Sequence, residues 1–263
     1  MNRGFEGKVC VLTGGANGIG RCILQSFAER GAKVAFIDVD EAAGRELEGK
    51  YGGCFFFAGD ISCKEILREF AGAVVQKYGR VDFLINNACY SNKGILSGCS
   101  YEDFSQILSV GVAAPYYLAL LFRDVFAQGA CIVNIASTRG YMSQPDTESY
   151  TAAKGGILAL THGLAASLMG RVRVNAVSPG WIDTREYQST KKDFTPLTKE
   201  DSLQHPAGRV GEPGDIANMV LFLCSPQAGF ITGQDFTVDG GMTRQMIYNG
   251  DFGWTYSGPE QTG

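Results

Sequence analysis

The chain has 263 residues, enough for one large α/β domain or two small ones with a sizeable core. Its formal charge of −4 offers no basic field for nucleic acid. No uninterrupted apolar run reaches the roughly 18 residues of a membrane span, and the polar segment Met1–Lys8 does not resemble a signal peptide. We therefore expect a cytoplasmic protein without nucleic-acid or membrane partners.

The cysteines and histidines argue against a metal site. None of the 8 cysteines has C-x-x-C spacing, and Cys10, Cys54 and Cys131 lie inside apolar runs. We interpret them as small buried hydrophobic residues rather than a disulfide framework or a zinc site. The 2 histidines are too few for the usual metal sites.

The first 31 residues predict a strand, a glycine-rich turn and a helix. The apolar run 9–12 ends in Thr13, the segment 14–20 is rich in glycine, and apolar residues with helical spacing then run from Ile19 to a stop at Gly31. Glycines let the backbone approach a pyrophosphate, and a helix N-terminus supplies N–H groups and partial positive charge. A plain tight turn would produce the same pattern.

An acidic residue follows the second predicted strand, 33–37. Asp38 at its carboxyl end can accept hydrogen bonds from ribose hydroxyls, and its charge would repel a 2′-phosphate. With no Arg or Lys in 38–41, the sequence favours NAD over NADP. Alternatively, Asp38 is the N-cap of the helix that starts near Glu41, and the two roles are compatible.

Predicted strands and helices alternate along the rest of the chain. Strands are predicted at 54–58, 82–85, 131–135, 172–177 and 235–238, and helices at 64–78, about 101–127, from Tyr150 to about Met169, and from Pro213 to about Ser225. This alternation predicts a single doubly wound, seven-stranded parallel sheet flanked by helices, a Rossmann fold. Ligands of such sheets bind at the carboxyl ends of the strands. Seven polar or turn residues fall there, namely Thr13, Gly14, Asp38, Asp60, Asn87, Ser137 and Pro179.

A tyrosine and a lysine at 150 and 154 are one helical turn apart. They share one face of the predicted helix, so the ammonium can lower the pKa of the phenol. A phenolate is a suitable general base for an alcohol proton. Such a pair is a weak signal alone, because amphipathic helices often contain one by chance.

Seven motifs together resemble the short-chain dehydrogenase/reductase family over roughly residues 5–243. They are T-G-G-A-N-G-I-G at 13–20, D-I at 60–61, N-N-A at 86–88, I-V-N-I-A-S at 132–137, Y-T-A-A-K at 150–154, P-G-W-I-D-T at 179–184 and V-D-G-G at 238–241. The resemblance implies catalysis by Tyr150 as general acid/base, with Lys154 supporting the phenolate and binding the nicotinamide ribose. Ser137 would hold the substrate oxygen.

The same resemblance implies an NAD site. Its residues would be Gly14, Asn17, Gly18, Ile19, Gly20, Asp38, Asp60, Ile61, Asn87, Ala88, Tyr150, Lys154, Pro179, Gly180, Ile182 and Thr184. It also implies a homotetramer or homodimer.

The sequence departs from the family pattern at two positions. Gly111 stands where the family has a catalytic Asn, whose main-chain carbonyl holds a relay water at a local helix distortion. Glycine keeps the carbonyl but lacks the amide, so the relay could persist or weaken, and we expect Gly111→Asn to be tolerated. Cys89 stands where the family commonly has glycine. We interpret it as a residue for packing or for shaping the substrate site, or alternatively as a redox-sensitive thiol.

The substrate site should include Ser137, Gln144, Tyr150, Trp181 and a loop at about 183–212. This loop contains Tyr187, Phe194 and Leu197, which favours a bulky hydrophobic alcohol such as a hydroxysteroid. The resemblance leaves open a glucose-type sugar dehydrogenase or a 3-oxoacyl reductase, and Gly111 leaves open an NAD-binding sensor without turnover. The aromatic tail at about 242–263 (Tyr248, Phe252, Trp254, Tyr256) should pack against its own domain or a neighbouring subunit.

Overall fold

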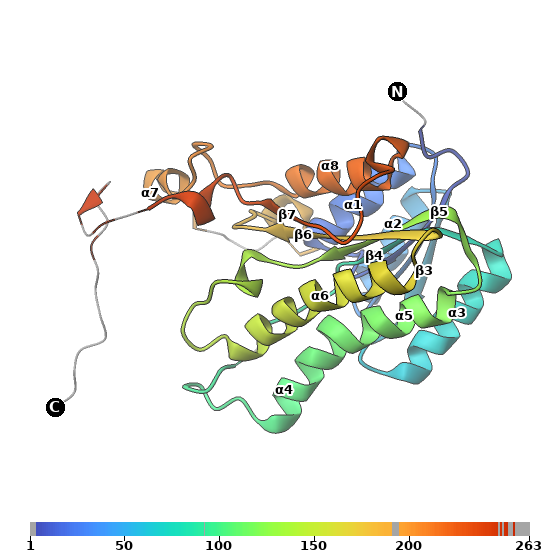
Figure 1. Cartoon of the computed structure of the whole chain (residues 1–263), viewed down its shortest axis with the longest axis horizontal. Helices are drawn as coiled ribbons and strands as arrows, with labels where there is room; N and C mark the ends of the chain where they lie inside the picture. The colour runs from blue at the N-terminus through green and yellow to red at the C-terminus, as the bar shows by residue number, and fades with distance from the viewer. Residues whose placement is uncertain are drawn as a thin grey trace.

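In the computed structural model, residues 4–91, 93–190, 195–246, 248, 250–251 and 255 are described. They form one α/β domain around a seven-stranded parallel sheet, in the order β3-β2-β1-β4-β5-β6-β7 (Figure 1). The strands are β1 (Val9–Thr13), β2 (Lys33–Asp38), β3 (Cys54–Ala58), β4 (Val81–Asn86), β5 (Phe126–Ile135), β6 (Val172–Pro179) and β7 (Asp235–Val238). The predicted fold class is confirmed.

Helices cover both faces of the sheet, as expected for right-handed crossovers between parallel strands. They are α1 (Gly18–Ala28), α2 (Glu41–Lys50), α3 (Lys64–Tyr78), α4 (Tyr101–Leu108), α5 (Ala114–Phe122), α6 (Glu148–Ser167), α7 (Lys199–Leu203) and α8 (Pro213–Cys224). One face carries α1 and α8, and the opposite face carries α3, α5 and α6 (Figure 1).

The strands are buried on both faces, so their residues alternate between two cores. In β2, Phe36 packs towards α1 and α8, whereas its neighbour Ile37 packs towards α3 and α5. Both side chains are 0% exposed. The near-continuous apolar runs of the sequence therefore reflect central parallel strands rather than one-sided ones.

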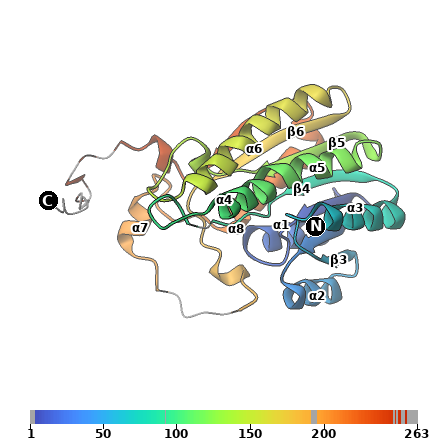
Figure 2. The same ribbon diagram turned by 90° about the horizontal axis from the view of Figure 1, so that it is seen from below.

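The order of the strands reverses between β1 and β4. β1 pairs with β2 on one side and with β4 on the other, and successive strands then add outward in the two directions. A crevice forms at such a reversal, beyond the carboxyl ends of the strands. The segment that carries α7 lies at one end of the sheet in both views (Figure 1 and Figure 2).

A chain of buried polar side chains joins the sheet to α6. The Asn86 amide donates to Asn134 Oδ1 at 2.7 Å, and the Asn134 amide donates to Thr161 Oγ1 at 2.9 Å. All three residues are at most 4% exposed. Because an unpaired buried amide is costly, these contacts fix how β4, β5 and α6 sit together.

The predicted helix over 101–127 is wrong in two respects. It contains a π-helical turn, η1 (Ser109–Ala113), between α4 and α5, and α5 ends at Phe122. The strand predicted at 131–135 begins earlier, because Phe126 pairs with Val81 of β4 and packs on the Phe122 ring with the ring centroids 6.4 Å apart. This tertiary contact overrides the apolar helical spacing.

The stretch Tyr101–Phe122 is long and apolar enough to meet the length and composition criteria for a membrane helix. A core helix of a globular protein meets the same criteria. Here α4 contacts α6, and α5 contacts α3 and β4.

Candidate active site

Tyr150, Lys154 and Ser137 line one cavity of about 790 Å³. Tyr150 and Lys154 lie one turn apart on α6, as predicted, and Ser137 follows β5. Lys154 is 3% exposed, and its ammonium donates to the Ile135 carbonyl at 2.8 Å. The ammonium nitrogen is 5.4 Å from the centroid of the Tyr150 ring. The carbonyl at the end of β5 therefore holds the Lys154 ammonium beside the Tyr150 ring.

Opposing effects set the pKa of Tyr150. Burial raises it above the usual value of a phenol, whereas the Lys154 ammonium, a hydrogen bond with Ser137 and the Arg139 guanidinium lower it. Burial has the largest effect, so the net direction is upward. Lysine lowers the phenol pKa as the sequence suggested, but it only partly offsets the cost of burial in the protein alone.

The glycine-rich turn lies where β1 and β4 separate. Thr13 Oγ1 accepts the backbone N–H groups of Asn87 and Ala88, each at 3.1 Å, and the Asn87 amide donates to the Gly14 carbonyl at 2.9 Å. A Cβ on Gly20 would stand 1.9 Å from the Gly14 oxygen, so the turn closes only with glycine there. Gly18 has φ +58, a left-handed conformation that favours glycine. The turn and the start of α1 therefore fit a pyrophosphate.

Asp38 ends β2 and faces this turn. Its carboxylate accepts the Ala16 N–H at 2.9 Å and the Asp40 N–H at 3.0 Å, which leaves acceptor capacity on both oxygens. The alternative role of Asp38 as a helix cap is wrong. Asp40 caps α2 by accepting the Ala43 N–H at 3.1 Å, and that bond and the Asn17 amide lower the pKa of Asp40.

The segment 184–189 lies over the glycine-rich turn. The Ser189 N–H donates to Asn17 Oδ1 at 2.6 Å, and the Ser189 hydroxyl donates to Asp40 at 2.8 Å. Thr184 and Gln188 are the neighbours that a Cβ on Gly18 would meet, at 3.6 and 3.8 Å. The segment 184–189 and the glycine-rich turn are thus hydrogen-bonded to each other.

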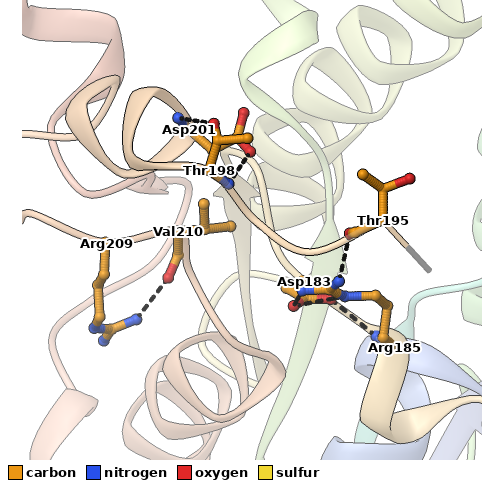
Figure 3. Close-up of polar contacts among 7 residues, drawn as sticks. All are labelled: Asp183, Arg185, Thr195, Thr198, Asp201, Arg209 and Val210. Carbon is orange, nitrogen blue, oxygen red and sulfur yellow. Dashed lines mark hydrogen bonds and ion pairs between the residues drawn. The ribbon is translucent and has the colours of Figure 1, made fainter.

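An ion pair and several hydrogen bonds order the loop at about 183–212. Arg185 pairs with Asp183 at 2.7 Å and donates to the Thr195 carbonyl at 2.9 Å (Figure 3). Thr198 and Asp201 form the capping box that starts α7 (Figure 3). These contacts place α7 beside the cavity, where Asp201 and Gln204 line the wall.

Tyr187 does not line the cavity, contrary to the expectation for the loop. It packs on the core cluster of α1 and α8, where a hydrogen bond with Cys22 and burial raise its pKa to about 12. Leu197 is also absent from the lining, and Phe194 lies outside the described residues. The rest of the lining mixes the polar Ser91, Ser143, Gln144, Asp201 and Gln204 with the apolar Met142, Trp181 and Met242.

The predicted site residues fall into two groups. Those that line the cavity are Ile19, Asn87, Ser137, Gln144, Tyr150, Lys154, Pro179, Gly180, Trp181, Ile182 and Thr184. Those outside it are Gly14, Asn17, Gly18, Gly20, Asp38, Asp60, Ile61 and Ala88, towards β1, β2 and β3. Cys89 lines the cavity and is exposed. Sequence reasoning missed Arg139, whose signal was its position two residues after Ser137.

Of the tail aromatics, Tyr248 is 68% exposed, and Phe252, Trp254 and Tyr256 lie outside the described residues. Packing of the tail stays a prediction.

Gly111 lies inside the π-helical turn η1, at the helix distortion that the resemblance implied. A Cβ there would stand 2.8 Å from the Cβ of Ala153, the residue before Lys154. The structure therefore argues against the expectation that asparagine is tolerated.

We predict that Gly111→Asn destabilises the protein by about 1–3 kcal/mol, because α4–α5 must move away from α6. Thermal unfolding measures this change. The matched control is Gly72→Ala in α3, where a Cβ meets nothing within 4 Å. It should stabilise the protein by about 0.5–1 kcal/mol. Equal unfolding temperatures for Gly111→Asn and the wild type would contradict the prediction.

Comparison with known proteins shows the family to which this fold belongs. Residues 14–243 match the family model adh_short_C2, described as Enoyl-(Acyl carrier protein) reductase. The chain is 43% identical to an uncharacterized oxidoreductase of Thermotoga maritima, over 93% of the chain and 99% of the relative. It is 36% identical to L-fucose dehydrogenase of Mus musculus, over 90% of the chain and 89% of the relative.

Among solved structures, an apo SCOR enzyme from Clostridium thermocellum matches with a TM-score of 0.86 and 47% identity, over 98% of this chain and 100% of that chain. The fold and these relatives define an oxidoreductase of a class that uses a nicotinamide cofactor. The chain belongs to the short-chain dehydrogenase/reductase family, whose members use NAD or NADP.

Proposed function

We propose that the protein is an NAD-dependent oxidoreductase that interconverts a secondary alcohol and a ketone, with Tyr150 as general acid/base. The observation that carries this proposal is the meeting of Ser137, Tyr150 and Lys154 in one cavity with Asn87 and Pro179, from the ends of β4 and β6. The residues of the glycine-rich turn and of this cavity fit a dinucleotide. When bound, NAD supplies the hydride acceptor.

The chain supplies orientation and proton transfer. In alcohol oxidation, the substrate hydroxyl gives its proton to Tyr150 Oη, and Ser137 holds the substrate oxygen. Lys154 favours the phenolate by its positive charge. In ketone reduction, the same phenol returns the proton. The main-chain carbonyl of Gly111 would hold the relay water in this scheme.

Asp38 supports NAD over NADP, because its carboxylate faces the glycine-rich turn with acceptor capacity to spare. We predict that Asp38→Ala lowers the ratio of kcat/KM for NAD to that for NADP by about tenfold, from loss of one charge-assisted hydrogen bond. The exposed Asp124→Ala is the control and should leave the ratio unchanged. An unaltered ratio in Asp38→Ala would show that the carboxylate only orders the turn.

The hydrogen-bonding side chains in the cavity lining favour a polar alcohol, such as a sugar or polyol, over a hydroxysteroid. The hydroxysteroid alternative depended on an aromatic lid, and Tyr187 packs on the core instead. Gln144, Asp201 and Gln204 offer hydrogen bonds that suit a hydroxylated substrate. The relative that acts on L-fucose supports the same class. Asp38 disfavours a 3-oxoacyl reductase, which mostly uses NADPH.

We propose a homotetramer or homodimer in the cytoplasm. Tyr101, Tyr116 and Leu120 expose apolar side chains on α4 and α5, at 82%, 51% and 42%, which suits contact with a second copy. The 8 cysteines are all free, as in a reducing compartment. The molar mass in solution, from light scattering, distinguishes a monomer from either assembly.

One assay tests the activity. Purified protein with NAD and a panel of sugars, polyols, hydroxy acids and steroids should produce NADH absorbance at 340 nm with at least one secondary alcohol. Silence across the panel with intact NAD binding would favour the sensor alternative.

A further inference from the structure

Arg139 is a charged residue of the cavity lining that has no carboxylate partner among the described residues. The ion pairs within the described part of the chain do not include it. The other charged lining residues are engaged. Lys154 donates to the Ile135 carbonyl, and the Asp201 carboxylate accepts the Thr198 N–H at 2.7 Å in the capping box of α7.

The position of Arg139 follows from the turn η2 (Thr138–Gly140). The backbone N–H of Arg139 donates to Ser137 Oγ at 3.2 Å. The guanidinium carbon of Arg139 is 5.7 Å from the centroid of the Tyr150 ring. The guanidinium therefore lies beside the Tyr150 ring, in the same cavity lining as Ser137 and Tyr150.

One nitrogen of the Arg139 guanidinium already donates a hydrogen bond to an uncharged oxygen of the protein. This contact leaves the other N–H groups of the guanidinium for other acceptors. Its Nη2 donates to the amide oxygen of Gln144, an exposed residue of the cavity wall. That oxygen marks a position that a ligand oxygen can take. The Gln144 amide nitrogen could then donate to the same ligand. A planar guanidinium binds a carboxylate with two parallel hydrogen bonds, stronger than those to a neutral amide.

We propose that Arg139 binds a carboxylate of the substrate, so that the substrate class is hydroxy acids and the corresponding oxo acids. This proposal rests on the proposed function and specifies its substrate. One cation and one neutral amide match a singly charged, planar carboxylate better than a phosphate dianion. The carboxylate and the carbinol of such a substrate would bind in the same cavity.

The test compares matched substrates. We would measure kcat/KM for NAD-dependent oxidation of 3-hydroxybutyrate, lactate and gluconate, each against its own carboxamide. The wild type should prefer the carboxylate in at least one pair by about 10- to 100-fold, the value of a charge-assisted pair over a neutral hydrogen bond. Arg139→Gln should remove that preference, and Arg139→Lys should keep part of it.

The ratio within a pair isolates the carboxylate. Both members use Tyr150, so any effect of Arg139 on the phenol cancels, and activity on the carboxamide reports folding. The matched control, Arg123→Gln, changes an exposed arginine that pairs with Asp124 outside the cavity and should leave the ratio unchanged. No preference in the wild type, or an unchanged ratio in Arg139→Gln, would overturn the proposal.

A binding experiment separates this proposal from the proposed function. Calorimetric titration of Tyr150→Phe in the presence of NADH, with the same pairs, needs no turnover. The carboxylate should bind more tightly than the carboxamide, and the difference should vanish in the double variant with Arg139→Gln. Equal affinities would overturn the role of Arg139 even in an active enzyme. If no alcohol is turned over but the affinities are unequal, the missing turnover refutes only the proposed chemistry, and the role of Arg139 in binding stands.

Discussion

Replacement of Tyr150 by phenylalanine is expected to lower kcat by about 10³-fold and to leave the Kd for NAD unchanged. The change removes only the oxygen that transfers the proton, and general acid–base catalysis contributes about 10²–10⁴-fold. The ring itself keeps its place between Lys154 and Arg139. Steady-state kinetics with any accepted alcohol and NAD titration by fluorescence measure the two quantities.

Tyr141→Phe is the matched control for this change. Tyr141 is 50% exposed, and its hydroxyl bonds to Thr237 outside the cavity lining at 2.6 Å. Its kcat should stay within about twofold of the wild type, since an exposed hydrogen bond contributes little. Full activity in Tyr150→Phe would assign the proton transfer to another group.

The pH dependence of kcat/KM tests the roles of Tyr150 and Lys154 independently. For alcohol oxidation, the phenolate is the base, so kcat/KM should rise with pH through the pKa of Tyr150. Lys154 lowers that pKa, and its removal in Lys154→Met should move the rise to higher pH. A shift to lower pH would contradict the role of the ammonium.

Replacement of Gly20 by alanine should weaken NAD binding by about 10- to 100-fold. The new Cβ would stand 1.9 Å from the Gly14 carbonyl oxygen and 2.5 Å from the Asn87 amide nitrogen, so the glycine-rich turn must move. Loss of one hydrogen bond to a charged pyrophosphate accounts for a change of this size. Calorimetric titration with NAD measures it.

Gly49→Ala in α2 separates this effect from a general response to glycine replacement. A Cβ on Gly49 meets nothing within 4 Å, so NAD affinity should be unchanged. Circular dichroism of Gly20→Ala must also show a folded protein, because only then does the Kd report the turn. Wild-type affinity in folded Gly20→Ala would show that the turn tolerates the displacement.

Local patterns predicted the sheet and the placement of Tyr150 and Lys154 on one helix. Fully buried strands produce continuous apolar runs, and the spacing of Tyr150 and Lys154 places them on one face of any helix. The end of α5 and the cap of α2 depended on contacts that spacing does not encode. Phe126 pairs with Val81 of β4, and Asp40 rather than Asp38 meets the first turn of α2.

The substrate wall was the least predictable part. The direction of Tyr187 depends on its contact with Cys22 of α1, far away in sequence. Arg139 looks like an ordinary surface residue until the structure places its guanidinium beside the Tyr150 ring. In both cases the side-chain environment comes from segments distant in the chain, and no local periodicity indicates it.

The buried amide chain from Asn86 through Asn134 to Thr161 has a consequence for how this enzyme can diverge. These hydrogen bonds connect α6, the helix of Tyr150 and Lys154, to the central strands β4 and β5. Gln144, Asp201 and Gln204, in contrast, belong to peripheral segments. Mutations in those segments can change which molecule is accepted without disturbing the reacting groups. New specificities can therefore evolve, or be engineered by exchanging loops, on an unchanged chemical centre.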